Sequence, residues 1–453
     1  MKCLAAGALV ATFALSAVTA SAKTLTLTIE QSRVLAIKAL NAGDAPLAWS
    51  LATGLLKRDP HDFTALLVMA RASARLNKMP EAREAARQAW REAKTPQQRF
   101  DAAMVRSQVL SSSGYRTASQ FWLRRAIQLA PNDRDKAAAV AGLRYVRSHS
   151  HWAFKIDASL QPSSNVNGGS ANSTMTIFGL PFILSGDARA LSGLVGSLGA
   201  TATYRFRPST NTLSSLRFSA VQTHNWLSSS ARRQAPNAKG SDYDYSDVEI
   251  GFSQQIRASV KSLAVYHWSA TLGRNWYGGN VLSDYIAGGV GVQRPLSPSV
   301  TFGADLGLQR QLRADVFSRS AVVTTGSAGL TWRLRNGDRL QVTVGDQDTH
   351  SKNIEIDHNM VFAQVTWDKA RPIRGVRIGA ALQMQHSRYG FFPFSTNGRS
   401  DTGVTASLTM VFDRVQYMGF SPSLTLELSR VHSNVSLYET RNFGVVVGVR
   451  STF

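Results

Sequence analysis

The sequence predicts an α + β multidomain protein, in which N-terminal α-helical repeats are followed by a transmembrane antiparallel β-barrel of about 14 strands. Three observations predict this fold class. The first 22 residues have the pattern of an export signal, the next part of the chain has helical spacing, and the remainder alternates apolar and polar residues up to its last residue. The expected divisions are 1–22, 23–147 and 148–453.

An export signal is predicted at the start of the chain. Lys2 precedes an apolar run, and the small residues Ala20, Ser21 and Ala22 follow it. A short apolar run that ends in a small-residue site is typical of a cleaved secretory signal, and a membrane anchor is the alternative that this length disfavours. We therefore expect cleavage after Ala22. The single cysteine, Cys3, lies inside this segment, so the mature chain offers no thiol or disulfide chemistry.

The stretch from Thr28 to Arg147 is rich in alanine, leucine and arginine at helical spacing. Three segments of it align at small residues, with intervals of 34 and 36 residues, and again at prolines, with intervals of 36 and 35. The aligned positions are Ala48, Ala82 and Ala118, then Pro60, Pro96 and Pro131. This period resembles tetratricopeptide repeats, whose stacked helix pairs form a groove for a partner. An alanine-rich helical domain without repeats is the alternative, and in either case Trp49, Trp90 and Trp122 are expected in the core.

Residues after the stretch SHSHW alternate between apolar and polar side chains, which indicates β-strands with two unlike faces. No apolar run in the mature chain approaches the roughly 20 residues of a transmembrane helix, so the chain can cross a membrane only as a closed barrel. A soluble β-sandwich is the alternative, but it would not need alternating strands up to the final residue. The fourteen predicted strands are 152–160, 191–206, 213–226, 244–256, 263–276, 283–294, 300–313, 321–335, 338–346, 357–367, 375–388, 402–412, 421–430 and 442–453.

The predicted boundaries also predict the sidedness of the connections. If the helical region is periplasmic, the first strand runs outward and the odd-numbered connections should be the long ones. The first two of these, 161–190 and 227–243, are the longest of all. Among the even-numbered connections, Asn336-Gly337 should form a two-residue turn with positive φ at both positions. An even strand number returns Phe453 to the periplasmic rim, where it would end the closing strand within the aromatic girdle.

Three stretches carry a resemblance to a known family. LQPSSNVNGG follows the first predicted strand, TIFGLPFILSGDARALSGLVGSLGATATYRF lies behind it, and RSDTGVTASLTMVFDRVQYMGFSPSLTLELSRVHSNVSLYETRNFGVVVGVRSTF ends the chain. They resemble the surface lipoprotein assembly modulator (Slam) family, as does the order of repeats and barrel over essentially the whole mature chain. The motif positions are Pro162, Ser164, Asn165 and Asn167, then Ser433, Asn434, Tyr438 and Arg441. Family members more often carry an acidic residue where Ser163 stands, which leaves the substrate open but not the class.

The resemblance implies a translocator in the bacterial outer membrane, with its N-terminal domain in the periplasm. The repeat domain would receive an unfolded client, and the barrel would pass it to the cell surface. Clients of the family are surface lipoproteins and, in some members, secreted proteins that acquire haem or metal. Further expected partners are a periplasmic chaperone, the outer-membrane barrel assembly machinery and lipopolysaccharide. A lateral gate would lie at the seam between the first and last strands, near the motif residues Pro162, Asn165, Asn167, Asn434, Tyr438 and Arg441.

Other functions fit the sequence less well. An exopolysaccharide export porin also joins periplasmic repeats to a barrel, but such exporters tend to have longer repeat arrays and an acidic lumen, whereas this chain has a net charge of +22. A diffusion porin would not need repeats. Nucleic acid is excluded as a partner because the arginines are scattered and the chain is exported.

Catalysis has little support in the sequence. The chain has no H-E-x-x-H, G-x-S-x-G or Walker motif, so it is not expected to be an enzyme. His149 and His151 lack a third ligand at a fixed spacing, so we expect neither a metal site nor a cofactor and interpret this stretch as a linker.

Overall fold

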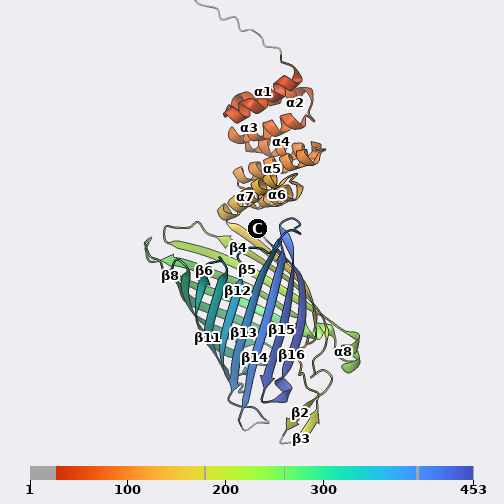
Figure 1. Cartoon of the computed structure of the whole chain (residues 1–453), viewed down its shortest axis with the longest axis vertical. Coiled ribbons are helices and arrows are strands. Elements are labelled where there is room, and N and C mark those ends of the chain that lie inside the picture. The colour runs from red at the N-terminus through yellow and green to blue at the C-terminus, as the bar shows by residue number, and fades with distance from the viewer. Residues whose placement is uncertain (1–26, 178–179, 260, 394–396, 452–453) are drawn as a thin grey trace, which may run out of the picture. The chain divides into compact units, whose positions relative to one another are not determined.

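The structure is a computed structural model that describes residues 27–177, 180–259, 261–393 and 397–451. Seven described helices precede the first strand, and the later strands close into a barrel (Figure 1). The chain divides into two compact units, the first ending at Lys94 and the second beginning at Thr95. The expected signal, 1–22, lies outside the described residues, and the expected extents of the helical and barrel domains stay predictions.

Four helices belong to the first unit: α1 (Ile29–Ala42), α2 (Ala45–Arg58), α3 (Phe63–Arg75) and α4 (Met79–Glu92). α1 begins where Thr28 and Gln31 form a capping box, and it ends at Gly43, which has a φ of 91°. Alanine side chains fill the helix interfaces, and both Ala48 and Ala82 are completely buried. Such small side chains let neighbouring helices approach closely, as stacked helical repeats require.

Three further helices open the second unit: α5 (Pro96–Ser112), α6 (Arg116–Leu129) and α7 (Asp133–His149). The predicted repeat alignment is wrong by one residue in α6. Ala118 is exposed, and Ser119 takes the buried fourth helical position that Ala48 and Ala82 take in α2 and α4. The buried Ser119 hydroxyl donates a hydrogen bond to the Ser107 carbonyl at 2.8 Å, which offsets the cost of removing it from water.

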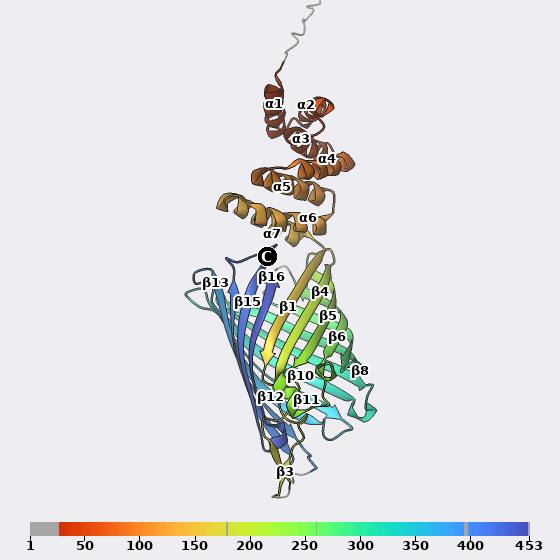
Figure 2. The ribbon, with the colours of Figure 1, turned by 90° about the vertical axis from the view of Figure 1, so that its right-hand side faces the viewer.

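Fourteen antiparallel strands close the barrel, which confirms the predicted fold class and strand number. β1 lies between β16 and β4, and the other barrel strands pair with their neighbours in the sequence (Figure 2). The largest differences from prediction are that β8, β11 and β15 are longer than expected. The strands are β1 (Trp152–Ser163), β4 (Gly193–Arg205), β5 (Thr212–Leu227), β6 (Tyr245–Arg257), β7 (Val265–Tyr277), β8 (Asn280–Ser297), β9 (Val300–Arg313), β10 (Ala321–Arg333), β11 (Arg339–Ser351), β12 (His358–Asp368), β13 (Val376–Tyr389), β14 (Arg399–Phe412), β15 (Phe420–Ser433) and β16 (Thr440–Ser451).

The two faces of the barrel wall differ as the alternation predicts. Along β1, Ile156 and Leu160 are exposed on the outer face, whereas Lys155 and Asp157 line the lumen. This arrangement suits a barrel that contacts lipid outside and water inside.

An aromatic girdle lies along the outer face at the rim where β1 begins, which we call the N-rim. Its successive ring centroids are 5.1–6.2 Å apart. Aromatic girdles of this kind lie at the membrane–water interface of outer-membrane barrels. Its members are Trp152, Phe154, Tyr204, Phe206, Phe252 and Trp268. Phe453, which is predicted to join the girdle, lies outside the described residues.

The two-residue turn predicted between β10 and β11 is wrong. The turn predicted at Asn336-Gly337 is a longer connection, 334–338, in which Gly337 and not Asn336 has a positive φ. The Gly337 N–H donates to the Leu334 carbonyl at 2.8 Å, so a type I turn followed by a left-handed glycine replaces the expected type I′ turn.

The rule that odd connections are long holds for the first two but not throughout, because β7 and β8 are joined by residues 278–279 alone.

The rim opposite the N-rim, which we call the loop rim, carries the two long connections. The first, 164–192, contains a hairpin of β2 (Thr174–Ile177) and β3 (Leu180–Ile183), and the second, 228–244, contains α8 (Ser229–Gln234). A buried cluster joins the two connections, so these loops have a small core of their own. It consists of Leu191, Leu227, Ala231 and Ala235.

Candidate functional site

The seam that closes the barrel, between β1 and β16, has the shortest strand pairing in the barrel. Among the described residues it contains four residue pairs, whereas β1 forms twelve pairs with β4 and β16 forms twelve with β15. Inside a membrane no water replaces a lost backbone hydrogen bond, so each missing pair lowers the free energy needed to separate these strands. Within the described residues, the seam is therefore the least paired part of the barrel wall.

Pro162 explains part of the short pairing. The pairing of β1 with β16 passes from Leu160 directly to Ser163, because proline has no N–H to donate to the ladder. At the N-rim, residues 152–157 of β1 pair with β4, and the described part of β16 adds no partner on their other side. Glycine lets the two strands approach closely where they do pair: a Cβ atom on Gly448 would lie 2.9 Å from the Ala158 carbonyl oxygen.

Side-chain hydrogen bonds join the two strands at the loop rim. The Asn442 side-chain oxygen accepts hydrogen bonds from the hydroxyls of Ser163, at 3.0 Å, and Ser164, at 3.1 Å. The Phe443 N–H donates to the Ser164 hydroxyl at 3.0 Å. These contacts cross from the end of β1 to the start of β16 beside Pro162.

The connections above the strands continue these contacts across the seam. The Ser170 hydroxyl donates to the Ser436 carbonyl at 2.8 Å, and the Asn172 amide donates to the Glu439 carboxylate at 2.7 Å. The hydrogen bond from Asn172 lowers the pKa of Glu439 below its usual range, so this carboxyl is ionised at neutral pH. The other Glu439 oxygen lies 2.7 Å from the His432 ring. We call these contacts together the seam latch. Its members are Ser163, Ser164, Ser170 and Asn172 on the β1 side and His432, Ser436, Glu439, Asn442 and Phe443 on the β16 side.

Removing one acceptor of the latch should loosen the seam locally. We expect Asn442→Ala to cost about 1–2 kcal/mol, because two hydroxyls lose their acceptor, and hydrogen exchange of the β1 amides near Ser163 should then accelerate roughly 5–30-fold. Exchange measured by mass spectrometry on the folded barrel tests this. The matched control is Asn275→Ala on β7, since the Asn275 side-chain oxygen accepts a hydrogen bond from the Ser283 hydroxyl at 2.8 Å, away from the seam. Equal acceleration in both variants would contradict a specific role for Asn442.

Two predicted site residues, Asn165 and Asn167, shape the first connection and do not themselves cross the seam. Asn165 donates to the Gly169 carbonyl at 2.8 Å. Asn167 donates to the carbonyls of Asp187, at 2.8 Å, and Arg189, at 2.9 Å. They hold the start and the end of the 164–192 connection together, which positions Ser170 and Asn172 for the latch.

The other predicted residues lie on the β16 side. The Asn434 side chain donates a hydrogen bond to the Gly398 carbonyl, just before β14, and accepts one from the Ser400 N–H, at the start of β14. The Tyr438 ring lies 3.8 Å from the guanidinium of Arg399, and the Tyr389 ring lies 3.5 Å from the same group. Arg399 also pairs with Asp401 at 3.1 Å. These contacts fix the 434–439 connection on which the latch depends.

Arg441 has a different setting. It is exposed and stands directly opposite Arg430 across β15 and β16. Two like charges in facing positions destabilise a sheet slightly unless an anion lies between them. This pair therefore offers a place for a phosphate or carboxylate group at the loop rim.

Several residues of the latch are absent from the predicted site. Asn442, Glu439, Ser163 and Asn172 are not among the predicted motif positions, although all lie within ten residues of one. Short polar side chains next to a proline and at a strand end were the available signal. It was weak because such residues are common in loops.

The lumen side of the seam carries charged side chains among apolar ones. A groove of about 530 Å³ runs there between Lys155 and Asp157 of β1 and Arg450 of β16. Elsewhere in the lumen, Arg217 pairs with Glu249 at 3.1 Å. The basic and acidic groups inside the barrel are thus mixed rather than uniformly acidic.

Two further findings concern the described part of the chain alone. None of its helices is both long enough and apolar enough to cross a membrane. No three histidine, cysteine, aspartate or glutamate side chains within it are placed to hold one metal ion. The absence of an enzymatic activity stays a prediction.

No family model and no curated protein matches this chain. Solved structures resemble its two parts separately. The TPR2B domain of yeast Sti1 in complex with an Hsp70 peptide is 18% identical over 27% of this chain and 98% of its own, with a TM-score of 0.25. OccAB3 of Acinetobacter baumannii is 9% identical over 66% of this chain and 99% of its own, with a TM-score of 0.37. A bacterial polysaccharide outer membrane secretin is 7% identical over 67% and 99%, with a TM-score of 0.33. Scores this low carry no argument about function.

Proposed function

We propose that this protein is an outer-membrane translocator that delivers surface lipoproteins, or related secreted proteins that acquire haem or metal, from the periplasm to the cell surface. The observation that carries the proposal is the closing seam, with four strand pairs and a latch of side-chain hydrogen bonds. A barrel that serves only as a pore gains nothing from a weak seam. A barrel that must release a polypeptide sideways needs one.

The helices supply the second half of the proposal. Alanine-packed helix pairs stack into repeats whose groove holds an extended partner. The helical region would lie in the periplasm, where it raises the concentration of a client, or of the chaperone that carries it, at the barrel mouth. Both features together fit protein delivery better than diffusion of small solutes.

The outer surface suits a position among lipopolysaccharide molecules. Arg430 and Arg441 would bind lipopolysaccharide phosphate at the loop rim, since arginine pairs strongly with phosphate. The girdle that includes Trp152 and Trp268 would lie at the periplasmic interface. Pro162 and the asparagines Asn165, Asn167 and Asn434 would serve the seam by shortening its pairing and shaping its latch.

Deleting residues 23–94 tests the function. This cut removes the first compact unit and leaves Thr95, which caps α5 together with Gln98, so the second unit should fold alone. We expect surface lipoproteins to fall at least about fivefold on intact cells, because client recruitment loses its effective-concentration gain, while their total amount persists. Labelling intact cells with a membrane-impermeant biotin reagent, followed by mass spectrometry, measures every surface lipoprotein at once, so the client is identified by the experiment itself.

The same cells decide between the two functions that the chain's layout allows. Cells lacking the whole chain give the baseline, and folded barrel is checked by its shifted migration in unheated gels. If lipoprotein display is unchanged in both strains and extracellular polysaccharide disappears, the chain is a polysaccharide exporter and the proposal is wrong.

A further inference from the structure

An apolar groove crosses the seam on the outer face of the barrel. Its volume is about 510 Å³, within the roughly 300–1,000 Å³ of ligand pockets. Its walls come from four adjacent strands, with Val447 on β16, Leu160 on β1, Leu198 on β4 and Trp226 on β5. Because these side chains belong to the outer apolar face, acyl chains rather than water meet the groove in a membrane.

Small residues create the groove. At Gly196 the Trp226 ring packs directly onto the barrel wall, since a Cβ atom there would lie 2.9 Å from that ring. Ala158 and Gly448 line both this outer groove and the groove on the lumen side, as do Ser159 and Ser197. The two grooves therefore lie on opposite faces of the same part of the wall. They are separated by three consecutive seam pairs, from Ala158–Val449 to Leu160–Val447, which must part before a polypeptide can pass between them.

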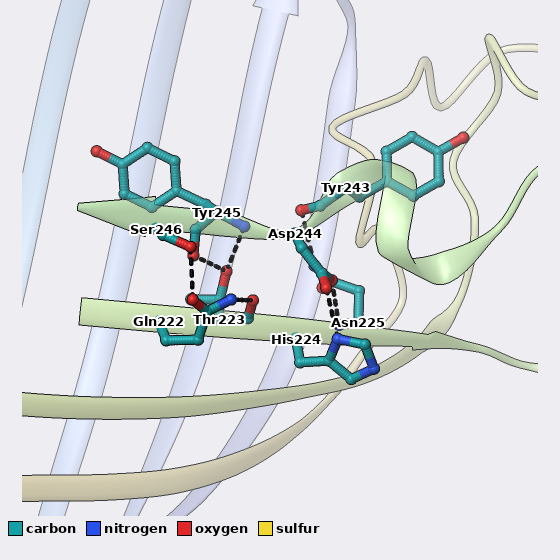
Figure 3. Close-up of polar contacts among 8 residues, drawn as sticks. All are labelled: Gln222, Thr223, His224, Asn225, Tyr243, Asp244, Tyr245 and Ser246. Carbon is teal, nitrogen blue, oxygen red and sulfur yellow. Dashed lines mark hydrogen bonds and ion pairs between the residues drawn. The ribbon is translucent and has the colours of Figure 1, made fainter. Parts of the chain in front are cut away.

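Polar groups stand beside the apolar walls. The His224 ring nitrogen Nδ1 lies 2.5 Å from an Asp244 oxygen, and the other Asp244 oxygen accepts the Asn225 N–H at 2.8 Å (Figure 3). Asp244 thus fixes the imidazole with Nε2 directed away from the carboxylate. Ser246 donates to the Gln222 side-chain oxygen at 2.5 Å (Figure 3). His224 and Gln222 both line the groove, so polar and apolar contacts are available in one site.

We propose that this outer groove binds the acyl chains of a lipid-modified N-terminal cysteine on the client. The acyl chains lie against Leu160, Leu198 and Val447, and the ester and amide groups of the modified cysteine meet His224 and Gln222. The polypeptide that follows lies in the lumen-side groove between Lys155 and Arg450. This inference rests on the proposed function and names its substrate class.

The choice of a lipoprotein over an ordinary membrane lipid follows from the paired grooves. A phospholipid has no polypeptide that could lie in the groove on the lumen side. A lipoprotein joins acyl chains to a polypeptide, so it can occupy the grooves on both faces of the wall. Membrane lipid is as apolar as the groove, so the preference must come from packing and from the polar groups. We therefore expect a selectivity of about fivefold rather than an exclusive site.

Photo-crosslinking to a defined lipopeptide tests the proposal. The probe is a biotinylated ten-residue serine-glycine peptide on a tripalmitoylated cysteine, added to the full chain in nanodiscs of phosphatidylethanolamine and phosphatidylglycerol. Benzoylphenylalanine replaces Leu198, or Leu272 on β7 as the control, because these leucines are 56% and 55% exposed. We expect about fivefold more lipopeptide adduct at position 198.

A groove-filling variant makes the result specific. Ala158→Trp should lower the adduct at position 198 about fivefold, while Ala270→Trp on β7, outside the groove, should not change it. Both are compared per amount of heat-modifiable, folded barrel. Biotinylated dipalmitoyl phosphatidylethanolamine in place of the lipopeptide should label positions 198 and 272 equally.

The outcomes separate this inference from the proposed function. Equal lipopeptide labelling at both positions, or equally selective labelling by phosphatidylethanolamine, would overturn the groove assignment whatever the display assay shows. A selective adduct in a chain whose loss leaves lipoprotein display unchanged would instead refute the proposed function, because binding is measured here without transport.

Discussion

Lipoprotein display should fall about tenfold or more when the seam is locked by a disulfide, because a covalent bond keeps β1 and β16 together and rearranges only over minutes to hours. The locking pair is Ala158→Cys with Val449→Cys, whose positions are register partners on the outer face. Neither position is a glycine, so both backbones already carry a Cβ atom, and directly opposite Cβ atoms lie about 4.5–5.5 Å apart, close to the roughly 3.5–4.5 Å of disulfides. No cysteine beyond Cys3 competes for pairing.

Reduction should restore display, which distinguishes a locked gate from a misfolded barrel. The matched control is Val344→Cys with Ala363→Cys, register partners on β11 and β12, outside both grooves and where the wall is continuously paired. Oxidising this pair should leave display unchanged. If the locked β1–β16 seam also leaves display unchanged, the client leaves through the lumen and the lateral exit is wrong.

Substituting the last residue should have the second-largest effect. Phe453→Ala should lower the amount of folded barrel about tenfold, since a phenylalanine side chain placed in an apolar environment contributes roughly 1.5–3 kcal/mol and the closing strand is completed last. The fraction of chain with shifted migration in unheated gels measures this.

The control residue has to be chosen from the structure. Phe392 would be a poor control, because it is buried and its ring packs edge to face on Tyr438 at 5.7 Å. Phe317, in the connection after β9, is 73% exposed and is the better match. If Phe317→Ala lowers the folded fraction as much as Phe453→Ala, the terminal aromatic residue has no special role.

Local patterns account for the parts of the fold that the sequence predicts well. Strand alternation is visible residue by residue, as in β9, where the predicted and observed boundaries coincide at Val300 and Arg313. The period of two survives because one face must meet lipid and the other water along every strand. The observed strand boundaries differ from the predicted ones where this contrast between the faces ends. β8 continues to Ser297 because its pairing with β9 extends beyond the alternating stretch.

Patterns with near-equal local alternatives are predicted less well. Ala118 and Ser119 are both small, and only the packing of α6 against its neighbours decides that Ser119 is buried. Asn336 can adopt a positive φ but is not forced to, so the longer turn at Gly337 forms instead. A single sequence cannot rank such choices, because their local free energies differ by less than the packing contributes.

By itself the sequence determined the order of helices and barrel, the strand number, and the two stretches near Pro162 and Asn434 that carry the family resemblance. Only the tertiary structure decided that Asn442 and Glu439 cross the seam, and that an apolar groove lined by Ala158, Gly196 and Gly448 lies on the outer face. The reason is physical. Alternation and helical spacing are properties of neighbouring residues, whereas a seam joins residues almost three hundred positions apart, and their contacts depend on the register in which the barrel closes.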